Sequence, residues 1–98
     1  MYGVVIANDG KEQIPDAGIT YGKDTLRFGN VMPKGSKGYG TVTLPIPDEV
    51  TIVWKQKSGR EFEKRVFVKS LIPNPSKFTG DIWLRLQDDG SVTVEVKK

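Results

Sequence analysis

Few residue types in this 98-residue chain could carry chemistry, because it contains no histidine and no cysteine. Without an imidazole there is no general base of the usual kind and no Ser-His-Asp triad. Without a thiol there is no thiolate nucleophile, and zinc sites normally draw on the same two residue types. The composition therefore predicts a protein that is not an enzyme, with no catalytic residue, no metal and no cofactor.

Adjacent carboxylates occur twice, at Asp48-Glu49 and at Asp88-Asp89. The first pair follows a proline and the second precedes a glycine, which is typical of turns, where aspartate forms local hydrogen bonds. A glycosidase would need two carboxyl groups that face each other across a cleft. The D-x-[DN]-x-[DN]-G spacing of a calcium loop does not occur either. We interpret both pairs as turns.

The segment Phe28–Gly40 combines four glycines with Lys34 and Lys37, a composition that invites a phosphate-binding interpretation. However, neither the P-loop pattern G-x-x-x-x-G-K-[ST] nor the dinucleotide pattern G-x-G-x-x-G occurs in it. Two interpretations stay open: a long flexible connection between sheets, and a loop that becomes ordered on a protein partner. For the second, we expect contacts from Lys34, Lys37 and Tyr39, the lysines through electrostatics and the tyrosine through buried area.

The rest of the sequence consists of short runs in which apolar and polar residues alternate, as in β-strands. No window keeps the i, i+3, i+4, i+7 spacing of an amphipathic helix, and we expect one domain over residues 1–98. The pattern predicts about seven strands and a shorter extended piece at Leu26–Gly29. The strands are expected at Tyr2–Asn8, Ala17–Tyr21, Gly40–Ile46, Val50–Gln56, Phe62–Lys69, Asp81–Gln87 and Ser91–Lys97.

The clearest prediction is a C-terminal hairpin around Asp88-Asp89-Gly90. Three loop residues that end in glycine fit a type I turn followed by a bulge, in which the glycine takes a positive φ. A register slip of one residue would turn every aliphatic side chain of the hairpin to the other face, so the register is well determined. The predicted cross-strand pairs are Ile82–Val96, Trp83–Glu95, Leu84–Val94 and Arg85–Thr93.

Two sheets that each have one apolar face bury those faces against each other. We therefore predict an all-β fold, a small antiparallel β-sandwich of immunoglobulin-like character. The alternative is an OB-like barrel of five strands, which would require the shorter runs to be loops. The expected core consists of Val4, Ile6, Val50, Ile52, Trp54, Val66, Val68, Ile82, Leu84, Leu86, Val92, Val94 and Val96.

Trp83 and Phe67 fall on the strand faces opposite the aliphatic stripes. Large apolar residues on a polar face are either covered by a loop or used for binding. The segment Leu71–Phe78 is long enough to provide such a cover. For a binding role we select Trp83 and Arg85, together with Tyr39, because interface hot spots favour these three residue types.

The chain carries 15 Lys plus Arg against 12 Asp plus Glu, which gives a net charge of +3. The basic residues are spread along the sequence, whereas a nucleic-acid binder concentrates them on one face. The charge distribution therefore disfavours nucleic acid as a partner. An OB-like module that binds single-stranded nucleic acid is kept as the alternative function, with Lys34, Lys37, Tyr39 and Trp83 as its basic and aromatic contacts.

Five stretches form a pattern that covers most of the chain: Tyr2–Ala7, Gly35–Gly40, Leu44–Trp54, Gly80–Leu84 and Asp88–Val92. The pattern resembles a family of short bacterial envelope proteins, often lipoproteins, some of which are immunity proteins against phospholipase effectors of type VI secretion systems. The resemblance implies a non-catalytic immunity or inhibitor protein that occludes the active site of a lipase-type toxin.

The same resemblance implies a location in the periplasm or at the envelope membrane. Attachment would use a lipidated N-terminus that is absent from this chain. Because Tyr2–Ala7 already has the pattern of a strand, we expect the chain to be a mature or trimmed form. The lack of cysteine is equally compatible with the cytoplasm.

Overall fold

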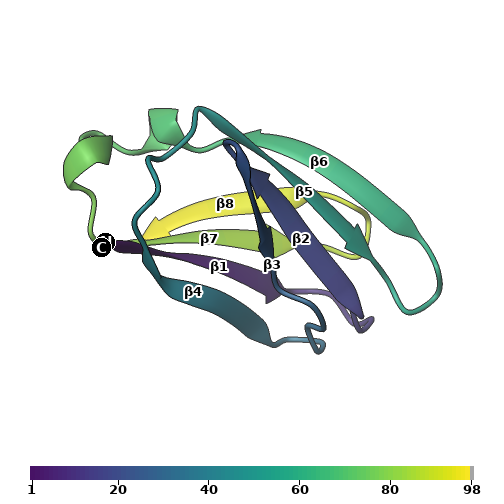
Figure 1. The fold of residues 1–98 in the computed structure, drawn as a ribbon. Coiled ribbons are helices and arrows are strands. Elements are labelled where there is room, and N and C mark those ends of the chain that lie inside the picture. The colour runs from purple at the N-terminus through teal and green to yellow at the C-terminus, as the bar shows by residue number, and fades with distance from the viewer. Residues whose placement is uncertain (98) are drawn as a thin grey trace.

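A computed structural model describes residues 1–97 and confirms the predicted β-sandwich. Within these residues, eight strands form two four-stranded sheets, one more strand than predicted and not the five-stranded barrel of the OB-like alternative (Figure 1). The strands are β1 (Tyr2–Asn8), β2 (Asp16–Tyr21), β3 (Asp24–Arg27), β4 (Ser36–Val42), β5 (Glu49–Lys55), β6 (Glu61–Phe67), β7 (Asp81–Leu86) and β8 (Val92–Lys97). Two 3-10 helices, η1 (Lys69–Leu71) and η2 (Pro75–Lys77), connect β6 to β7. No helix in residues 1–97 is long and apolar enough to cross a membrane.

The first sheet has the strand order β4-β1-β7-β8, and the second has the order β3-β2-β5-β6. Neighbouring strands are antiparallel except for β1 and β7, which run parallel. The prediction of a wholly antiparallel arrangement is therefore wrong at this pair. Parallel neighbours need a crossover connection, and here the crossover contains the entire second sheet. Because β8 returns antiparallel to β7, both termini lie at the same end of the sandwich (Figure 1).

The C-terminal hairpin has the predicted register. Trp83 lies opposite Glu95, and Leu84 lies opposite Val94. The amide of Gln87 donates to the carbonyl oxygen of Ser91 at 3.0 Å, and Gly90 has a φ of 89°. A residue with this φ is usually glycine, because a side chain would be strained there. The pairing and the glycine conformation of the predicted turn are both confirmed.

The core lies between the sheets and contains most of the residues predicted for it. Buried members of that prediction are Val4, Ile6, Val50, Ile52, Trp54, Val68, Ile82, Leu84 and Leu86. Val66, Val92, Val94 and Val96 are only partly buried, because β6 and β8 are the outermost strands of their sheets. Large aromatic side chains that the prediction omitted complete the core: Tyr2, Tyr21, Phe28 and Phe78.

The glycine-rich segment Phe28–Gly40 is not a loop throughout, which both interpretations of its composition assumed. Its second half is β4, which pairs with β1, whereas the strand predicted at Gly40–Ile46 ends at Val42. Glycine is depleted in strands, yet here it permits close packing. A Cβ atom on Gly38 would lie 2.9 Å from Cγ2 of Val5 and 3.1 Å from the carbonyl oxygen of Val4. The absence of a side chain at this position is therefore a packing requirement.

Candidate binding surface

The outer face of the first sheet carries a cluster centred on a tryptophan, which we call the Trp83 face. It consists of Val5, Gly38, Trp83, Arg85, Glu95 and Lys97. Val5 lies opposite Gly38 on β4 and opposite Trp83 on β7, and Trp83 lies opposite Glu95 on β8. Opposed residues share one face of a sheet. The alternate residues Val4 and Leu84 are buried in the core, so the Trp83 face points away from it.

Two cations flank the indole ring of Trp83. The guanidinium carbon of Arg85 lies 5.1 Å from the ring centroid, and Nζ of Lys97 lies 4.1 Å from it. Each such contact contributes about 0.5–1 kcal/mol at an exposed site. Trp83 is half-buried, and its Nε1 is enclosed without an acceptor among residues 1–97. The cations therefore hold the ring in one position at the surface, which reduces the cost of ordering it on a partner.

Carboxylates connect the same two cations. Nη1 of Arg85 lies 3.1 Å from Oδ1 of Asp9, and Nη2 lies 3.6 Å from Oε1 of Glu95. Nζ of Lys97 lies 3.2 Å from the same Oε1 atom. The hydrogen bond from Lys97, with the charges of Lys97 and Arg85, lowers the pKa of Glu95. Because both cations are already paired with carboxylates, this face offers little free positive charge to a phosphate backbone.

Lys34 belongs to the same neighbourhood. Its Nζ donates to the carbonyl oxygen of Asp9 at 2.6 Å, and the side chain of Asp9 accepts from Arg85. Lys34 also has a φ of 62°, in the left-handed region that few residues other than glycine adopt. The structure thus brings together three of the five predicted site residues: Lys34, Trp83 and Arg85.

Lys37 and Tyr39 lie on the opposite face of the first sheet. Lys37 lies opposite Ile6 and Tyr39 lies opposite Val4, both of which point into the core. The hydroxyl of Tyr39 donates to the carbonyl oxygen of Arg27, and its ring packs edge-on against Phe28 with centroids 5.2 Å apart. Tyr39 therefore links β4 to the end of β3 while its side chain remains 40 % exposed.

The expected loop cover is also wrong. Phe67 is 65 % exposed, so the segment Leu71–Phe78 does not cover it. The flanking groups of Trp83 are cations of its own sheet rather than this segment. Phe78 instead packs against Tyr2, with ring centroids 5.9 Å apart, and closes one end of the core.

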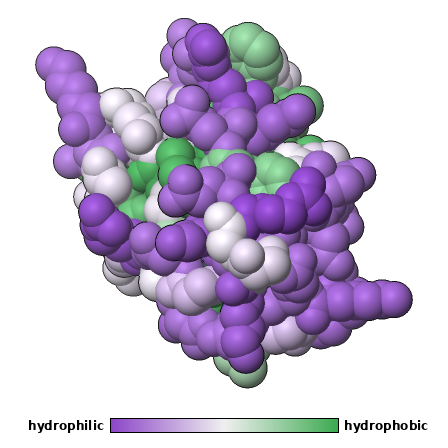
Figure 2. Space-filling view, turned by 90° about the vertical axis from the view of Figure 1, so that its right-hand side faces the viewer, coloured by the Kyte–Doolittle hydropathy of each residue, from purple (hydrophilic) through white to green (hydrophobic). Residues whose placement is uncertain are grey.

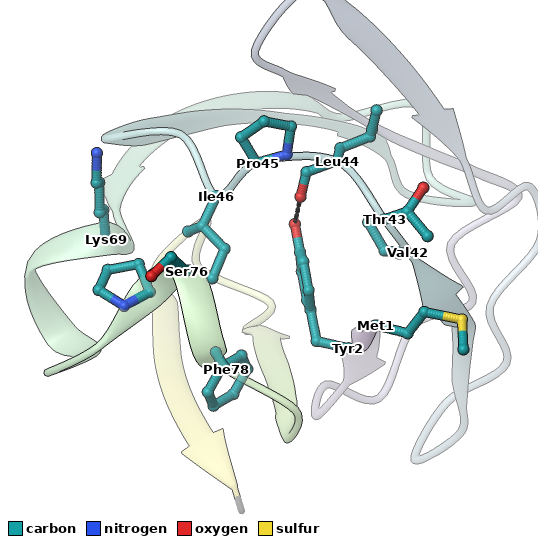
Figure 3. A pocket seen from close by; sticks show the side chains of 11 residues that line it. Met1, Tyr2, Val42, Thr43, Leu44, Pro45, Ile46, Lys69, Ser76 and Phe78 are labelled. Atoms are coloured by element: carbon teal, nitrogen blue, oxygen red, sulfur yellow. Dashed lines mark hydrogen bonds between the residues drawn. The ribbon is translucent and has the colours of Figure 1, made fainter.

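That end contains a cavity of about 380 Å³, drawn in Figure 3. The hydroxyl of Tyr2 donates to the carbonyl oxygen of Leu44 at 2.7 Å, which uses its single proton. The Tyr21 hydroxyl must then donate to the Tyr2 oxygen at 2.6 Å, which joins the two sheets. Burial raises the pKa of both tyrosines. Of residues 1–97, Lys69 is the single charged side chain that lines the cavity.

The opposite end of the sandwich is mostly hydrophilic, with a small apolar area near its centre (Figure 2). Here the carboxylate of Asp88 accepts the amides of Lys11 and Glu12 at 2.9 Å and 3.5 Å. Asp89 accepts both the amide and the hydroxyl of Ser91, and these bonds lower the pKa of Asp89. The turn interpretation of Asp88-Asp89 is confirmed. Residues 1–97 hold no group of three or more potential metal-ligating side chains.

The sequence analysis did not identify two contacts of the Trp83 face, Lys97 beside Trp83 and Asp9 beside Arg85. Lys97 shares the alternation of Glu95, so the predicted hairpin register already places it on the same face as Trp83. Asp9 follows the end of β1 and reaches Arg85 only because β1 and β7 are neighbours. No local pattern predicts that parallel pairing, so Asp9 could not have been found by alternation.

Comparisons with known proteins support the fold and leave the function open. No protein-family model matches the chain, and no curated protein matches its sequence. The NMR structure of a protein from Eubacterium rectale matches it with a TM-score of 0.63, at 10 % sequence identity, over 98 % of this chain and 87 % of that chain. A likeness at this identity shows a shared fold alone.

Proposed function

We propose that this chain is a non-catalytic protein-binding domain whose contact surface is the Trp83 face. The observation that carries the proposal is the Trp83 indole ring, held between Arg85 and Lys97 on a solvent-facing sheet surface. Tryptophan and arginine contribute the largest share of binding energy at protein interfaces. Gly38 adds no side chain beside Val5, so a partner can approach the ring from the β4 side.

The partner that we propose is a secreted antibacterial enzyme of the lipase type. The chain would be an immunity protein of a type VI secretion system that occludes the active site of a phospholipase effector. The family resemblance of the strand-and-turn pattern supports this assignment, as does a composition without histidine or cysteine. In this proposal the chain works in the periplasm, as a lipoprotein whose lipidated N-terminus lies outside this chain.

The test is a binding and inhibition assay with a phospholipase effector, sought among the genes that neighbour the gene for this chain. We expect the wild-type chain to form a stable complex and to inhibit phospholipid hydrolysis. Arg85→Ala should weaken the complex about tenfold or more, which corresponds to about 1.4 kcal/mol. The matched control is Arg65→Ala, because Arg65 lies on the outer face of the second sheet and pairs with Glu49 at 3.5 Å.

Comparing Arg85→Ala with Arg65→Ala distinguishes the loss of a specific contact from a general loss of positive charge. Equal affinity of both variants and the wild type would remove the Trp83 face as the contact surface. Absence of any complex or inhibition with the neighbouring effector would contradict the immunity assignment. Fractionation of cells that express the gene under its own promoter tests the envelope location, which a purely cytoplasmic product would contradict.

A further inference from the structure

Strand β4 is a free edge of the first sheet. It pairs with β1 on one side and has no neighbouring strand on the other within residues 1–97. Six of its seven residues are exposed, and only Val42 is buried. An edge strand directs a row of unpaired amide and carbonyl groups outward, which is a template for a further strand.

The hydrogen bonds of β1 identify the outward-facing groups of β4. The amides of Gly3 and Asp9 donate toward β7, at 3.0 Å to Gly80 and 3.0 Å to Leu86, whereas the amide of Asn8 donates toward β4, to Gly35. Because the direction alternates along a strand, even-numbered residues of β1 bond to β4. Their partners therefore direct their own backbone groups inward to β1. Those partners include Lys37, opposite Ile6, and Tyr39, opposite Val4.

It follows that Ser36 and Gly38 direct their N–H and C=O groups away from the sheet, toward the free edge. Both residues are exposed, and neither carries a large side chain that would obstruct a strand arriving alongside. Lys37 and Tyr39 then flank the edge on one face of the sheet, while Val5 and Trp83 lie beyond Gly38 on the other. The outward backbone groups of this edge are therefore accessible to another strand, and side chains border the edge on both faces of the sheet.

The other three edges of the sandwich are protected. Strand β3 has four residues, and the carbonyl oxygen of Arg27 at its end already accepts the Tyr39 hydroxyl. Strand β6 carries charged side chains at four of its seven positions, which is a common protection against strand addition. Strand β8 lies next to β6 across the side of the sandwich. Among residues 1–97, β4 is the longest edge strand without a row of charged side chains, although its Tyr39 reaches the end of β3.

Charge selects the kind of segment that would fit. Residues 29–47 contain two lysines, Lys34 and Lys37, and no aspartate or glutamate. Lys34 is engaged with the carbonyl oxygen of Asp9, whereas no ion pair within residues 1–97 involves Lys37. A second copy of β4 would bring like charges together, which disfavours self-pairing. An acidic strand would instead be attracted to this edge.

We propose that β4 binds an extended acidic segment of the partner protein by β-strand addition. The proposal rests on the proposed function for the existence of that partner, and it adds the part of the partner that is recognised. Backbone hydrogen bonds to Ser36 and Gly38 supply affinity, and Lys37 selects acidic side chains. Only Gly38 separates the added strand from Val5 on the outer face, so a partner that extends across Gly38 can cover both the edge and the Trp83 face.

A peptide experiment tests the edge without the effector. The probe is a short capped peptide in which threonine alternates with glutamate, titrated into the ¹⁵N-labelled chain and followed by NMR. We expect shift changes centred on β4 and slower hydrogen exchange of the Ser36 and Gly38 amides. A peptide of the same sequence with every backbone nitrogen methylated should not bind, because neither of its edges can then donate a hydrogen bond. A peptide with lysine in place of glutamate should bind at least about tenfold more weakly.

Paired variants locate the contact. Ser36→Pro removes an outward-facing N–H at the first residue of the strand without removing a bond to β1, so the fold should persist while peptide binding is lost. Ser36→Ala keeps the amide and should bind like the wild type. Lys37→Glu should abolish the preference for the acidic peptide. Lys23→Glu, at the exposed turn between β2 and β3, makes the same charge change away from the edge and should preserve that preference.

Three outcomes would overturn the inference: no change at β4, equal binding of Ser36→Pro and Ser36→Ala, or equal binding of the lysine peptide. A concentration-dependent dimer that protects the Ser36 amide would assign the edge to a second copy and would also contradict it. If the effector binds normally to Ser36→Pro, strand addition is wrong while the proposed function stands. If the peptide binds to β4 but the effector does not bind at all, the proposed partner is wrong.

Discussion

The apolar side chains on the outer faces of the two sheets have different surroundings. On the first sheet, Trp83 is half-buried between two cations that share carboxylate partners. On the second, Val53 and Phe67 are 48 % and 65 % exposed, and they lie opposite Glu63 and Glu49 rather than each other. Scattered apolar residues are normal on a protein surface, whereas the Trp83 ring is held between two cations, and our proposal of a contact site is based on this difference. The presence of an apolar residue alone therefore does not distinguish a binding face.

The largest expected effect comes from truncating a tryptophan in the core between the two sheets. Trp54 is 1 % exposed, and its ring lies 5.2 Å from that of Phe62, measured between centroids. Trp54→Ala should lower the free energy of unfolding by about 3–5 kcal/mol, because the truncated side chain leaves a cavity. Urea unfolding measures the loss. An unchanged unfolding midpoint would show that the two sheets do not depend on this contact.

The second prediction concerns the glycine of the Trp83 face, Gly38, which lies opposite Val5. At Gly38 a Cβ atom would press against Val5, whereas at Gly40 it would meet nothing within 4 Å. Gly38→Ala should therefore cost about 1–3 kcal/mol through overpacking. Gly40→Ala should be neutral or stabilising by up to about 1 kcal/mol, because alanine loses less backbone entropy than glycine. Thermal unfolding of the pair tests this, and equal melting temperatures would contradict a packing role for Gly38.

The placement of Trp83 and Arg85 on one outer face was predictable from the sequence, because it depends only on local features. The Gly90 turn fixes which residues of β7 and β8 face each other, and the aliphatic alternation fixes which of them point outward. The strands predicted at Val50–Gln56 and Phe62–Lys69 likewise form a hairpin in the structure, in which Trp54 lies opposite Phe62. Local turn chemistry and period-2 alternation were sufficient for these two hairpins.

The β4 strand and the Asp9 contact were not predictable for two separate reasons. Glycine adds nothing to an apolar–polar alternation, so Gly38 and Gly40 concealed most of a strand in which Gly38 is needed for packing. Asp9 contacts Arg85 because β1 pairs in parallel with β7, and these two strands lie far apart in the sequence. Long-range pairing depends on how the two sheets assemble, and no local window contains that information.

The third prediction compares one arginine from each face. Arg85 contacts two carboxylates and an indole ring, and its side chain is 27 % exposed. Arg65 contacts Glu49 alone and is largely exposed. In the free chain, Arg85→Ala should cost about 1 kcal/mol of unfolding free energy, and Arg65→Ala should stay within about 0.5 kcal/mol of the wild type. Equal losses in urea unfolding would mean that the charged network does not hold Trp83.

The smallest expected effect is the pH dependence of stability that Glu95 contributes at the Trp83 face. Lys97 lowers the pKa of Glu95 through a hydrogen bond, with further contributions from the charges of Lys97 and Arg85. A carboxyl group whose pKa is lower in the folded state stabilises the fold above its unfolded pKa and loses that contribution as the pH falls through its folded pKa. The stability advantage of the wild type over Glu95→Gln should therefore be constant above about pH 4.5 and should vanish on further acidification. Urea unfolding of both proteins across this range measures the difference, in which all other titrating groups cancel.

Repeating the comparison with Lys97→Met in both proteins should flatten the pH dependence, because the main cause of the lowered pKa is then absent. A difference between wild type and Glu95→Gln that is the same at every pH would mean that Glu95 contributes through packing alone, and that the ionic network does not distinguish the first sheet from the second.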